Sequence, residues 1–410
     1  METALTRLIQ SDGQQKAKRG TAHTPEEIYK QVEIWSDTSA RIRMQEARLR
    51  EIFTRVKSAK RPAAIVCTGA GTSEFAGYCL EALLRKRMGM AVNVISSARI
   101  VSTPEDCFTG GYQTLLLSFA RSGDSPESLG SVRIADMLAT DVSHLAVTCN
   151  ARGALFNEIN GRADGLAVAL DERCNDLGLA MTASFTNMVV AGQTLAHLYA
   201  LPAYERQLDN LIRAGAAIRD AAPAVTEQIA GLGFERAVFL GDGANYGTAI
   251  ESHLKLQELT AGQVMCTWDS FAGLRHGPEA VIHPNTLVVA YLATDAYTRR
   301  YQLDLIRGIH EKAIGKALLC VAHSVPDEIR RFCDYTIEYG QAADAVADDL
   351  LPPAYVLVGQ LLGLFTSLKR GLKPDNPSPQ GVIHRVVEGV KVYDPEAFRR
   401  SGKARIIAER

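Results

Sequence analysis

The second half of this chain repeats the first half at a constant spacing, and this repeat limits the possible folds more than any other feature. Gly241 and Gly243 follow Gly69 and Gly71 by 172 residues, and two further pairs of apolar segments keep that spacing. Those pairs are Thr114–Asp124 with Thr286–Ala296, and Leu145–Asn150 with Ala317–Ala322. One match between apolar segments could arise by chance, but three at a common spacing indicate a duplicated domain.

Each copy alternates apolar runs of strand length with helical segments. The first copy begins with Arg61–Leu84, in which a strand, a glycine turn and a helix follow one another. Further apolar runs of strand length occur at 91–98, 114–123, 144–150 and 165–170. This alternation predicts an α/β protein with two tandem doubly wound parallel sheets.

At 410 residues the chain is too long for one ordinary core, and we expect four parts. They are an N-terminal helical arm (1–45), a first domain (46–202), a second domain (203–373) and a C-terminal tail (374–410). The best helix of the arm begins at Thr24, which we expect to act as N-cap with Pro25 at the first helical position.

Composition and charge exclude several classes of protein. The formal net charge is −1, so nothing in it favours nucleic acid or an anionic membrane as a partner. The N-terminus has no apolar signal core, and no apolar run reaches transmembrane length. The eight cysteines include no CxxC pair and no Cys/His ligand spacing. We therefore expect a soluble, cytoplasmic protein with reduced cysteines and without disulfides or a zinc site.

The segment FARSGDSPES, residues 119–128, is a candidate anion site. An apolar strand precedes it and an amphipathic helix follows, so hydroxyls and backbone N–H groups meet the positive end of a helix dipole. The polar residues concerned are Arg121, Ser122, Gly123, Asp124 and Ser125. From the loop alone two interpretations stay open: Ser125 or Asp124 only caps the helix, or the loop binds a phosphate.

The two copies differ where chemistry is expected. The copy of this loop, Tyr291–Arg300, has fewer hydroxyls, an additional acid at Asp295 and no proline. Only the second half carries a dense polar helix, on which Glu251, Lys255 and Glu258 share one face. This triad is either a solvated set of ion pairs or part of a ligand site. The position of its helix, after a Gly-x-Gly turn at the carboxyl end of a strand, favours the ligand site.

A histidine in the second half is a candidate for proton transfer. His276 lies in the Gly/Pro-punctuated segment Trp268–Ala280, between Arg275 and Glu279. Its near-neutral pKa suits general acid–base work, although a turn histidine bonded to the backbone is the alternative. The other histidines that we considered, His144, His253 and His323, are expected to be structural.

A dinucleotide site is the alternative for the second glycine turn. Gly241–Gly247 has a GxGxxxG spacing after a strand, and Asp269 is a candidate for the acid at the end of the next strand. That spacing departs from the usual fingerprint, and the first copy departs further. No Walker A sequence occurs.

Four motifs resemble those of the sugar-isomerase (SIS) family. They are GAGTSEF (69–75), SFARSGDSPES (118–128), ESHLKLQEL (251–259) and RHGPEA (275–280). Their arrangement in paired halves is similar to the isomerase half of glucosamine-6-phosphate synthase. The loop at 121–128, the segment 175–188 and the tail 374–393 look more like the SIS subgroup called tagatose-6-phosphate ketose/aldose isomerases, now regarded as galactosamine-6-phosphate deaminases. The resemblance spans residues 45 to 393.

This resemblance implies a set of substrate-binding residues. They are Gly71, Thr72, Ser73, Arg121, Ser122, Gly123, Ser125 and Glu251. Ser73, Ser122 and Ser125 would hold the sugar phosphate. Arg121 stands where the synthase has a glutamine, and we expect its guanidinium to clamp the phosphate.

The resemblance also implies the catalytic residues. Glu258 matches the carboxylate that shuttles a proton, and Lys255 and Glu251 match its polar support. His276 matches the ring-opening histidine, which in the synthase comes from the neighbouring subunit, so a homodimer that shares His276 is implied.

Two departures bear on the reaction. The C-terminal lysine of the synthase has no clear counterpart, and His384 and Arg385 are the nearest candidates. The chain also lacks a glutaminase domain, and residue 2 is Glu in place of a nucleophilic Cys. Without that ammonia donor, the deaminating direction is favoured.

We therefore expect an enzyme that converts D-galactosamine 6-phosphate and water to D-tagatose 6-phosphate and ammonia, without a metal or cofactor. A simple ketose/aldose phosphate isomerase and a non-catalytic sugar-phosphate sensor are the alternatives. The presence of both Glu258 and His276 argues against the sensor, because sensing requires only the phosphate loops. The epimer of the sugar stays open.

Overall fold

The computed structural model describes residues 2–378, 380–387, 389–401 and 404–409, within which the chain forms two compact units. The first-copy unit comprises Ile34–Asn175, Asn187–Leu201 and Ile383–Arg410. The second-copy unit comprises Met1–Glu33, Asp176–Thr186 and Pro202–Val382. Each unit thus combines three segments, whereas the expected parts are contiguous ranges ending at residues 45, 202 and 373.

Apolar packing explains which unit takes each end of the chain. Leu8 of α1 (Ala4–Gln10) is buried, and it lines a cavity together with Phe365 of the second-copy unit. Val392, in the tail, is buried against helix α7 (Pro126–Leu138) of the first-copy unit, where a Cβ atom at Gly130 would lie 2.7 Å from Val392 Cγ1. The arm and the tail therefore each complete the core of the unit to which they belong.

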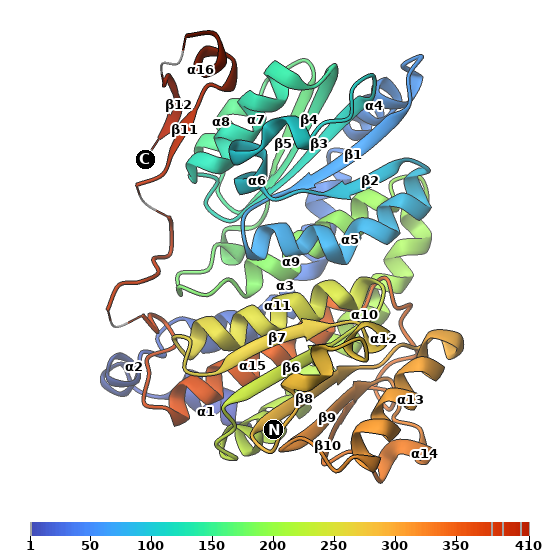
Figure 1. The fold of residues 1–410 in the computed structure, drawn as a ribbon, viewed down its shortest axis with the longest axis vertical. Helices are drawn as coiled ribbons and strands as arrows, with labels where there is room; N and C mark the ends of the chain where they lie inside the picture. The colour runs from blue at the N-terminus through green and yellow to red at the C-terminus, as the bar shows by residue number, and fades with distance from the viewer. Residues whose placement is uncertain (1, 379, 388, 402–403, 410) are drawn as a thin grey trace. The chain divides into compact units, whose positions relative to one another are not determined.

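The first-copy unit contains a five-stranded parallel sheet in the order β2-β1-β3-β4-β5 (Figure 1). Its strands are β1 (Ala63–Thr68), β2 (Ala91–Val94), β3 (Gln113–Ala120), β4 (Asp141–Thr148) and β5 (Gly165–Ala169). The central strand β3 is buried along its whole length, and this burial on both faces accounts for its mostly apolar sequence.

Helices surround this sheet. They are α4 (Glu46–Ser58), α5 (Thr72–Met88), α6 (Ser97–Ser102), η1 (Pro104–Asp106), α7 (Pro126–Leu138), α8 (Ala154–Ile159), η2 (Glu172–Cys174) and α16 (Pro395–Ser401). An antiparallel hairpin of β11 (Lys391–Tyr393) and β12 (Ile406–Glu409) completes the unit. Leu116 and Ala120 of β3 face the core formed with α7 and α8, whereas the alternate residues of β3 face the opposite side.

The second-copy unit contains a second five-stranded parallel sheet, in the order β7-β6-β8-β9-β10. Its strands are β6 (Arg236–Leu240), β7 (Met265–Asp269), β8 (Thr286–Tyr291), β9 (Ala317–Ala322) and β10 (Tyr335–Glu338). The strand order repeats that of the first copy, so the predicted pair of doubly wound α/β sheets is confirmed.

The helices of the second-copy unit include the arm. They are α1, α2 (Gly13–Arg19), α10 (Leu201–Ala230), α11 (Ala244–Leu259), α12 (Phe271–Leu274), η3 (Pro278–Val281), α13 (Ala296–Glu311), α14 (Asp327–Arg330) and α15 (Pro352–Lys369). Helices α3 (Thr24–Arg43) and α9 (Ala183–Ala196) contribute residues to both units.

The start of α3 differs from the expected cap. The hydroxyl of Thr24 donates to the carboxylate of Asp375 at 2.8 Å, and the same carboxylate accepts the backbone N–H groups of Ala22, His23 and Thr24. An acid from a distant part of the chain therefore satisfies the first amides of this helix, and sequence spacing along the arm could not show that.

Strand order also marks where a ligand is expected. In open α/β sheets, ligands bind outside the carboxyl ends of the strands where the strand order reverses. In the first copy this switch point lies between β1 and β3, whose following loops are Gly69–Ser73 and Arg121–Ser125. In the second copy it lies between β6 and β8, whose following loops are Gly241–Asn245 and Ala293–Tyr297.

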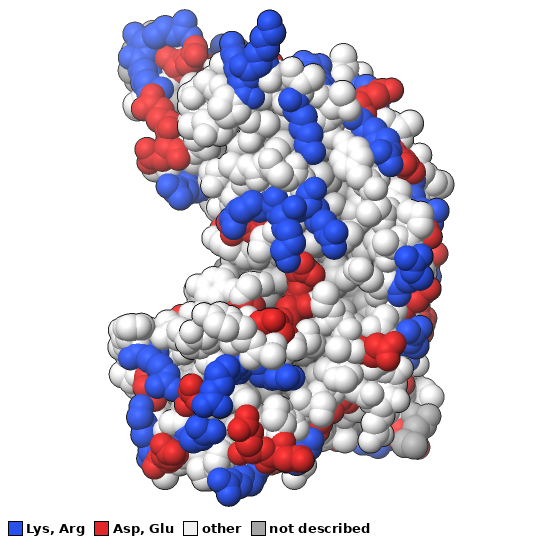
Figure 2. All heavy atoms as spheres, turned by 90° about the vertical axis from the view of Figure 1, so that its right-hand side faces the viewer, with Lys and Arg blue, Asp and Glu red and all other residues white. Residues whose placement is uncertain are grey.

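Lys, Arg, Asp and Glu side chains are mixed on the face that Figure 2 shows. Figure 2 shows basic and acidic side chains in short groups that alternate over the face in view. Across the described part of the chain, no helix combines the length and apolar character that a membrane crossing requires. All eight cysteines are free thiols.

Candidate functional site

The two glycine turns have the same backbone conformation in both copies. Gly71 has φ 55° and ψ −125° before α5, and Gly243 has φ 59° and ψ −129° before α11. A positive φ of this kind favours glycine. A Cβ atom at Gly69 would lie 2.6 Å from the backbone of Ser73, so the turn brings the strand end close to the start of the helix.

In the first copy this turn presents an open hydroxyl at the start of a helix. Thr72 and Ser73 begin α5, and both are almost fully buried. The Ser73 hydroxyl makes no hydrogen bond to any residue that the structure describes; its backbone N–H donates to the Ala70 carbonyl at 3.2 Å. A hydroxyl at the positive end of a 17-residue helix suits an anion.

The neighbouring loop, after β3, has open backbone donors. The N–H groups of Ser122, Gly123 and Ser125 have no acceptor among the described residues. The Ser122 hydroxyl accepts the Asp124 N–H at 3.2 Å, which leaves its own proton available. Because β1 and β3 pair directly, with Thr68 opposite Ser118, this loop is adjacent to the glycine turn. Together the two loops have the composition of an anion site.

Ser125 caps helix α7, which agrees with the capping interpretation of the loop. Its hydroxyl accepts the Ser128 N–H at 3.3 Å and lies 2.7 Å from the Ser128 hydroxyl. Asp124 caps a different helix, because its carboxylate accepts the N–H of Ala154, the first residue of α8, at 3.0 Å. The Asp124 carboxylate is therefore engaged by the start of α8. Helix capping by Ser125 and Asp124 is thus compatible with anion binding by the open N–H groups of the loop.

Arg121 connects this loop with the tail. It is 7% exposed, and its guanidinium donates to the carbonyl of Arg385. The Arg385 guanidinium donates in turn to Asn175 Oδ1 at 2.8 Å. Arg385, one of the two candidates for the missing lysine, therefore contacts the candidate anion loop through its backbone carbonyl. Two other residues of the predicted tail motif, Pro379 and Glu388, lie outside the described residues.

In the second-copy unit, α11 holds the predicted acid–base triad. Lys255 Nζ lies 2.6 Å from Glu258 Oε2 and 3.4 Å from Glu251 Oε1. The side chains of Lys255 and Glu251 are 1% and 0% exposed, whereas that of Glu258 is 24% exposed. The solvated ion-pair interpretation is therefore wrong for this helix, because Lys255 bridges a buried and an accessible carboxylate.

The environment of Lys255 keeps it charged. Burial alone would lower the pKa of its ammonium, but the charges and hydrogen bonds of Glu251 and Glu258 outweigh burial and raise the pKa above its usual value. A permanently charged lysine at 2.6 Å holds the Glu258 carboxylate in one orientation. Such an arrangement suits a carboxylate that exchanges protons with a ligand.

His276 lies in an exposed turn between α12 and η3. Its backbone N–H donates to the Gly273 carbonyl at 2.9 Å, and its imidazole makes no hydrogen bond to the described part of the chain. The alternative interpretation, a turn histidine whose ring is hydrogen-bonded to the backbone, therefore does not hold for His276 among the described residues. Nearby Glu279 pairs with Lys312 and is a surface contact.

The predicted site residues therefore fall into two groups. The phosphate candidates from Gly71 to Ser125 gather at the switch point of the first copy, whereas the triad and His276 belong to the second-copy unit. Asp269 ends β7, as the dinucleotide alternative requires, and its carboxylate accepts the Ser270 N–H at 2.7 Å.

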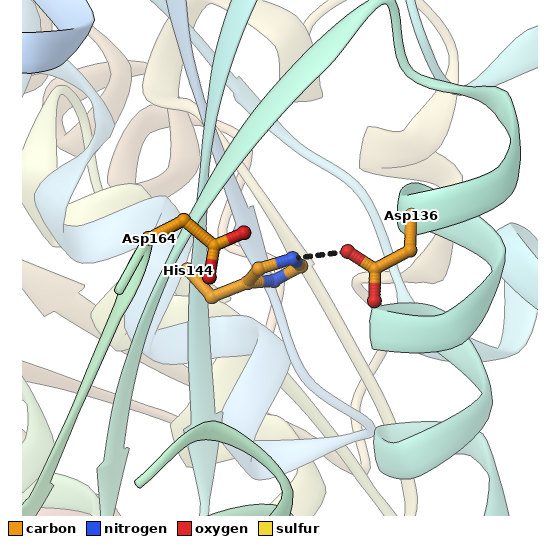
Figure 3. A group of neighbouring side chains, drawn as sticks. All are labelled: Asp136, His144 and Asp164. Carbon is orange, nitrogen blue, oxygen red and sulfur yellow. Dashed lines mark hydrogen bonds and ion pairs between the residues drawn. The ribbon is translucent and has the colours of Figure 1, made fainter. Parts of the chain in front are cut away.

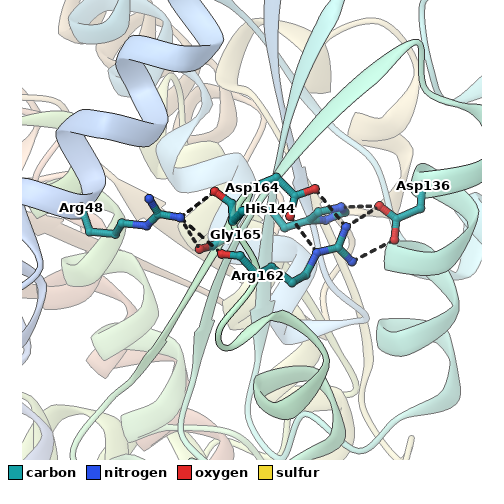
Figure 4. A network of polar contacts seen from close by, with 7 residues as sticks. Arg48, Asp136, His144, Arg162, Asp164 and Gly165 are labelled. Carbon is teal, nitrogen blue, oxygen red and sulfur yellow. Dashed lines mark hydrogen bonds and ion pairs between the residues drawn. The ribbon is translucent and has the colours of Figure 1, made fainter.

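One further polar cluster has the residue types of a metal site. Side-chain atoms of Asp136, His144 and Asp164 lie within 4.8 Å of one another in the first-copy unit (Figure 3). Arg162 donates to both carboxylates, at 2.9 Å to Asp136 Oδ2 and 2.9 Å to Asp164 Oδ1 (Figure 4). The guanidinium already supplies the positive charge that a metal would bring, so the cluster is a structural network.

The structure describes all three histidines expected to be structural, of which His323 packs edge-on against Tyr339. His144 is fully buried and bonds Asp136 at 2.8 Å within this network. His253 packs on Trp268 with ring centroids 4.1 Å apart, and burial followed by the charge of Lys255 lowers the pKa of its imidazole to about 4. His144 is thus engaged in a buried contact, and His253 is not suited to proton transfer near neutral pH.

Sequence reasoning missed some polar residues of these loops. Ser128 shares a hydrogen bond with Ser125, and its spacing of three residues from a helix cap is a signal that could have found it. Asp348 and Gln302 contact the degenerate loop of the second copy, from 54 and 9 residues away, and no local pattern indicates them.

Known proteins resemble the whole chain. A Streptomyces coelicolor protein provisionally named D-galactosamine-6-phosphate deaminase AgaS is 37% identical over 90% of this chain and 95% of its own length. D-galactosamine-6-phosphate deaminase AgaS of Shewanella sp. is 32% identical over 93% and 94%. The structure of a Clostridium novyi protein provisionally identified as tagatose-6-phosphate ketose/aldose isomerase superposes with a TM-score of 0.88 at 32% identity, covering 92% and 96%. No protein-family model matches the chain.

Proposed function

The chain belongs to the D-galactosamine-6-phosphate deaminase (AgaS) family of sugar-isomerase proteins, and on this premise we propose that it converts D-galactosamine 6-phosphate and water to D-tagatose 6-phosphate and ammonia. The observation that carries the proposal is the similarity to named deaminases over nine-tenths of the chain. It supports an enzyme in preference to a sugar-phosphate sensor.

The first-copy unit anchors the phosphate of the substrate. The open N–H groups of Ser122 and Gly123 and the hydroxyls of Ser73 and Ser122 are suitable donors for its oxygens. Arg121, which now bonds a tail carbonyl, adds a guanidinium to this set. Binding the phosphate, which is remote from the reacting carbons, holds the sugar for the chemical step.

Glu258 carries out the proton transfer. In the open-chain sugar it removes the proton from C2, which gives an enolamine, and it returns a proton to C1. The product of this transfer is an imine at C2. Water adds to that carbon and ammonia leaves, so the ketose forms without net oxidation or reduction. Lys255, itself paired with Glu251, orients the Glu258 carboxylate for the first transfer.

His276 assists ring opening by proton exchange with the ring oxygen and the C1 hydroxyl. Its exposed position and free imidazole are consistent with service to a substrate held by a second copy of the chain. We therefore propose a homodimer in which each His276 completes the site of the partner. The free cysteines fit a reducing compartment, and we propose a cytoplasmic location.

The direct test is incubation of the purified chain with D-galactosamine 6-phosphate and, separately, D-glucosamine 6-phosphate. We expect ammonia and ketose in equal amounts from the galacto sugar. The matched control is Glu258→Gln, which should lose turnover by at least about 1,000-fold, at the strong end of the range for a positioned acid–base group, while still binding substrate. If neither sugar releases ammonia at enzyme concentrations near that of the substrate, the deaminase proposal fails.

Plain isomerisation is the second candidate, because the protein with the TM-score of 0.88 carries the name of a tagatose-6-phosphate ketose/aldose isomerase. In that case galactose 6-phosphate and tagatose 6-phosphate would interconvert, and the amino sugar would release no ammonia. Scoring ammonia and ketose for every sugar separates the two reactions in one panel.

A further inference from the structure

The degenerate loop of the second copy occupies the same topological position as the proposed phosphate loop. It follows β8, which is next to β6 at the switch point of the second sheet, as β3 is next to β1 in the first. Thr294 and Asp295 therefore correspond to Ser122 and Gly123 at the repeat spacing. A loop of this kind at the N-terminus of a 16-residue helix is a general anion-binding element.

An internal carboxylate already binds this loop. Asp348 Oδ1 accepts the Thr294 N–H at 2.6 Å and the Thr294 hydroxyl at 2.8 Å, and Asp348 Oδ2 accepts the Asp295 N–H at 3.1 Å. In the first copy the corresponding N–H groups of Ser122 and Gly123 have no acceptor among the described residues. The same donors are thus open in one copy and bound to a carboxylate in the other.

A second side chain closes the rest of the loop. The Ala293 N–H donates to Gln302 Oε1 at 2.8 Å, and Gln302 Nε2 donates to Asp242 Oδ2 at 2.9 Å. Asp242 stands in the glycine turn after β6, at the position that Ala70 has in the first copy. Both loops at the second switch point are therefore tied together by polar side chains of the chain itself.

We propose that the Asp348 carboxylate is an internal substitute for a phosphate, which keeps the anion loop of the second copy occupied and confines each chain to the single phosphate site of the first copy. The inference extends the proposed function, since it rests on phosphate binding by the Ser122 loop. Asp348 is a specificity-determining residue that acts by exclusion: it fills the donors, and its charge repels a second anion.

Tethering gives Asp348 its advantage over a free anion. The carboxylate is part of the folded unit, so its effective concentration at the loop is on the order of millimolar or higher, and no translational freedom is lost when it binds. Asp295 and Asp242 add negative charge to the same loops. Free phosphate therefore has neither open donors nor a favourable potential at this position.

The test is phosphate binding to three variants of the full chain, measured by equilibrium dialysis with inorganic phosphate. Asp348→Ala removes the substitute and should raise the stoichiometry from one to two phosphates per chain. Asp348→Asn keeps the shape, and its amide oxygen can still accept from the N–H and hydroxyl of Thr294, so it should still bind one. Asp295→Ala is the matched control, since it removes an acid that bonds the Thr298 N–H and leaves the Asp348 contacts intact.

A second measurement, thermal unfolding, keeps the test decisive if Asp348→Ala is less stable than the wild type. Asp348→Ala should unfold at a lower temperature than the wild type in chloride, and formate at equal ionic strength should restore its Tm, with no such gain in the wild type or Asp295→Ala. The proposal is overturned if Asp348→Ala binds one phosphate, if formate does not restore its Tm or its fold, or if the wild type binds two. If the wild type binds no phosphate, the proposed phosphate site at Ser122 is contradicted instead. The difference in bound phosphates per chain between Asp348→Ala and the wild type still decides the role of Asp348.

Discussion

Lys255 is the residue whose environment departs furthest from that of an ordinary helical lysine. It is buried between two acids, and only Glu258 of these has a substantially accessible side chain. Breaking a buried ion pair by removal of one partner is far more costly than replacing the whole pair by uncharged groups. This difference allows the structural and catalytic contributions of Lys255 to be separated.

We expect Lys255→Met to lower the free energy of unfolding by about 3–5 kcal/mol, because Glu251 would remain buried without its cation. The double variant Glu251→Gln/Lys255→Met should recover most of that stability but not turnover, since Glu258 would still lack its ammonium partner. Urea unfolding and kcat measure the two effects. Lys312→Met, which removes an exposed ion pair with Glu279, should cost less than about 1 kcal/mol. Recovery of turnover in the double variant would assign Lys255 a purely structural role.

Glu27 should make stability depend on pH near neutrality. Burial, followed by the charge of Asp176, raises the pKa of Glu27 from 4.5 to about 7, although its carboxylate accepts the Leu177 N–H at 2.6 Å. The folded chain thus binds this proton more tightly than the unfolded chain. The resulting stabilisation is complete below pH 4.5 and is lost as the pH rises to about 7.

Glu27→Gln should abolish this decline, so its stability relative to the wild type should increase by up to roughly 3 kcal/mol between pH 4.5 and pH 8, at about 1.4 kcal/mol per pKa unit. Urea unfolding across that range measures the difference, and Glu26→Gln, an exposed neighbour on the same helix, is the control. Parallel pH profiles for Glu27→Gln and the wild type would show that Glu27 does not titrate as described.

At the level of single residues, the sequence predicts which residues form the candidate site better than it predicts their burial and contacts. The hydroxyls of Ser73 and Ser122 and the triad on α11 follow from motif and helical spacing. The burial of Lys255 does not, because a lysine between two acids has the same sequence pattern on a solvated helix. Asp348 and Glu27 contact partners from distant segments, which the order of residues alone does not reveal.

Among the elements, α15 determines where the triad helix lies. Gly359 and Gly363 of α15 approach α11 so closely that a Cβ atom at Gly359 would lie 2.8 Å from Ser252 Cα, and one at Gly363 would lie 2.9 Å from the Lys255 carbonyl oxygen. Two small residues one turn apart thus let the two backbones meet. The helix that carries Lys255 and Glu258 is fixed from its far side by this contact.

We expect Gly363→Ala to push α11 and α15 apart and to lower both the unfolding free energy, by about 1–3 kcal/mol, and kcat. The displaced helix would carry Glu258 away from its proposed position, with KM for the sugar phosphate changed little because the proposed phosphate loops belong to the other unit. Gly13→Ala is the control, since no atom lies within 4 Å of the added methyl group. A more stable Gly363→Ala protein with unchanged kcat would contradict this assignment to α15.

The strands that the sequence predicts well are those in the centre of each sheet. β1, β3, β4, β6, β8 and β9 are almost continuously buried, and their sequences are mostly apolar. β7 and β10 lie at the edges of the second sheet and are mostly half-buried, so their mixed sequences carry no clear signal. The strands of the β11–β12 hairpin are only three and four residues long and partly exposed, so their sequences carry no clear strand signal either.

For the whole molecule, the repeat predicts the topology of both sheets but not the composition of the two units. The spacing of 172 residues is enough to imply two sheets of the same strand order, which the structure contains. It carries no information about the arm and the tail, which have no copy. Their apolar side chains, such as Leu8 and Val392, pack against the unit whose folded surface can bury them. That surface exists only after folding, so the order of residues does not reveal it.

The proposed dimer leads to a test at the scale of the assembly. If His276 serves the partner's site, Glu258→Gln and His276→Ala are defects in different halves of each site. Mixing and re-associating the two inactive variants in equal amounts should then create heterodimers with one intact site. With random pairing, half of the dimers would be mixed and half of their sites intact, so about a quarter of wild-type activity should return.

The control for this experiment is a mixture of Glu258→Gln with Lys255→Met. Both defects lie in the same triad, so no pairing of these subunits yields an intact site, and the mixture should stay inactive. If the His276→Ala mixture also stays inactive after mass spectrometry has shown that the subunits exchange, then His276 acts within its own chain or not at all. Because the readout is restored turnover, a merely structural role for either residue could not produce the expected result.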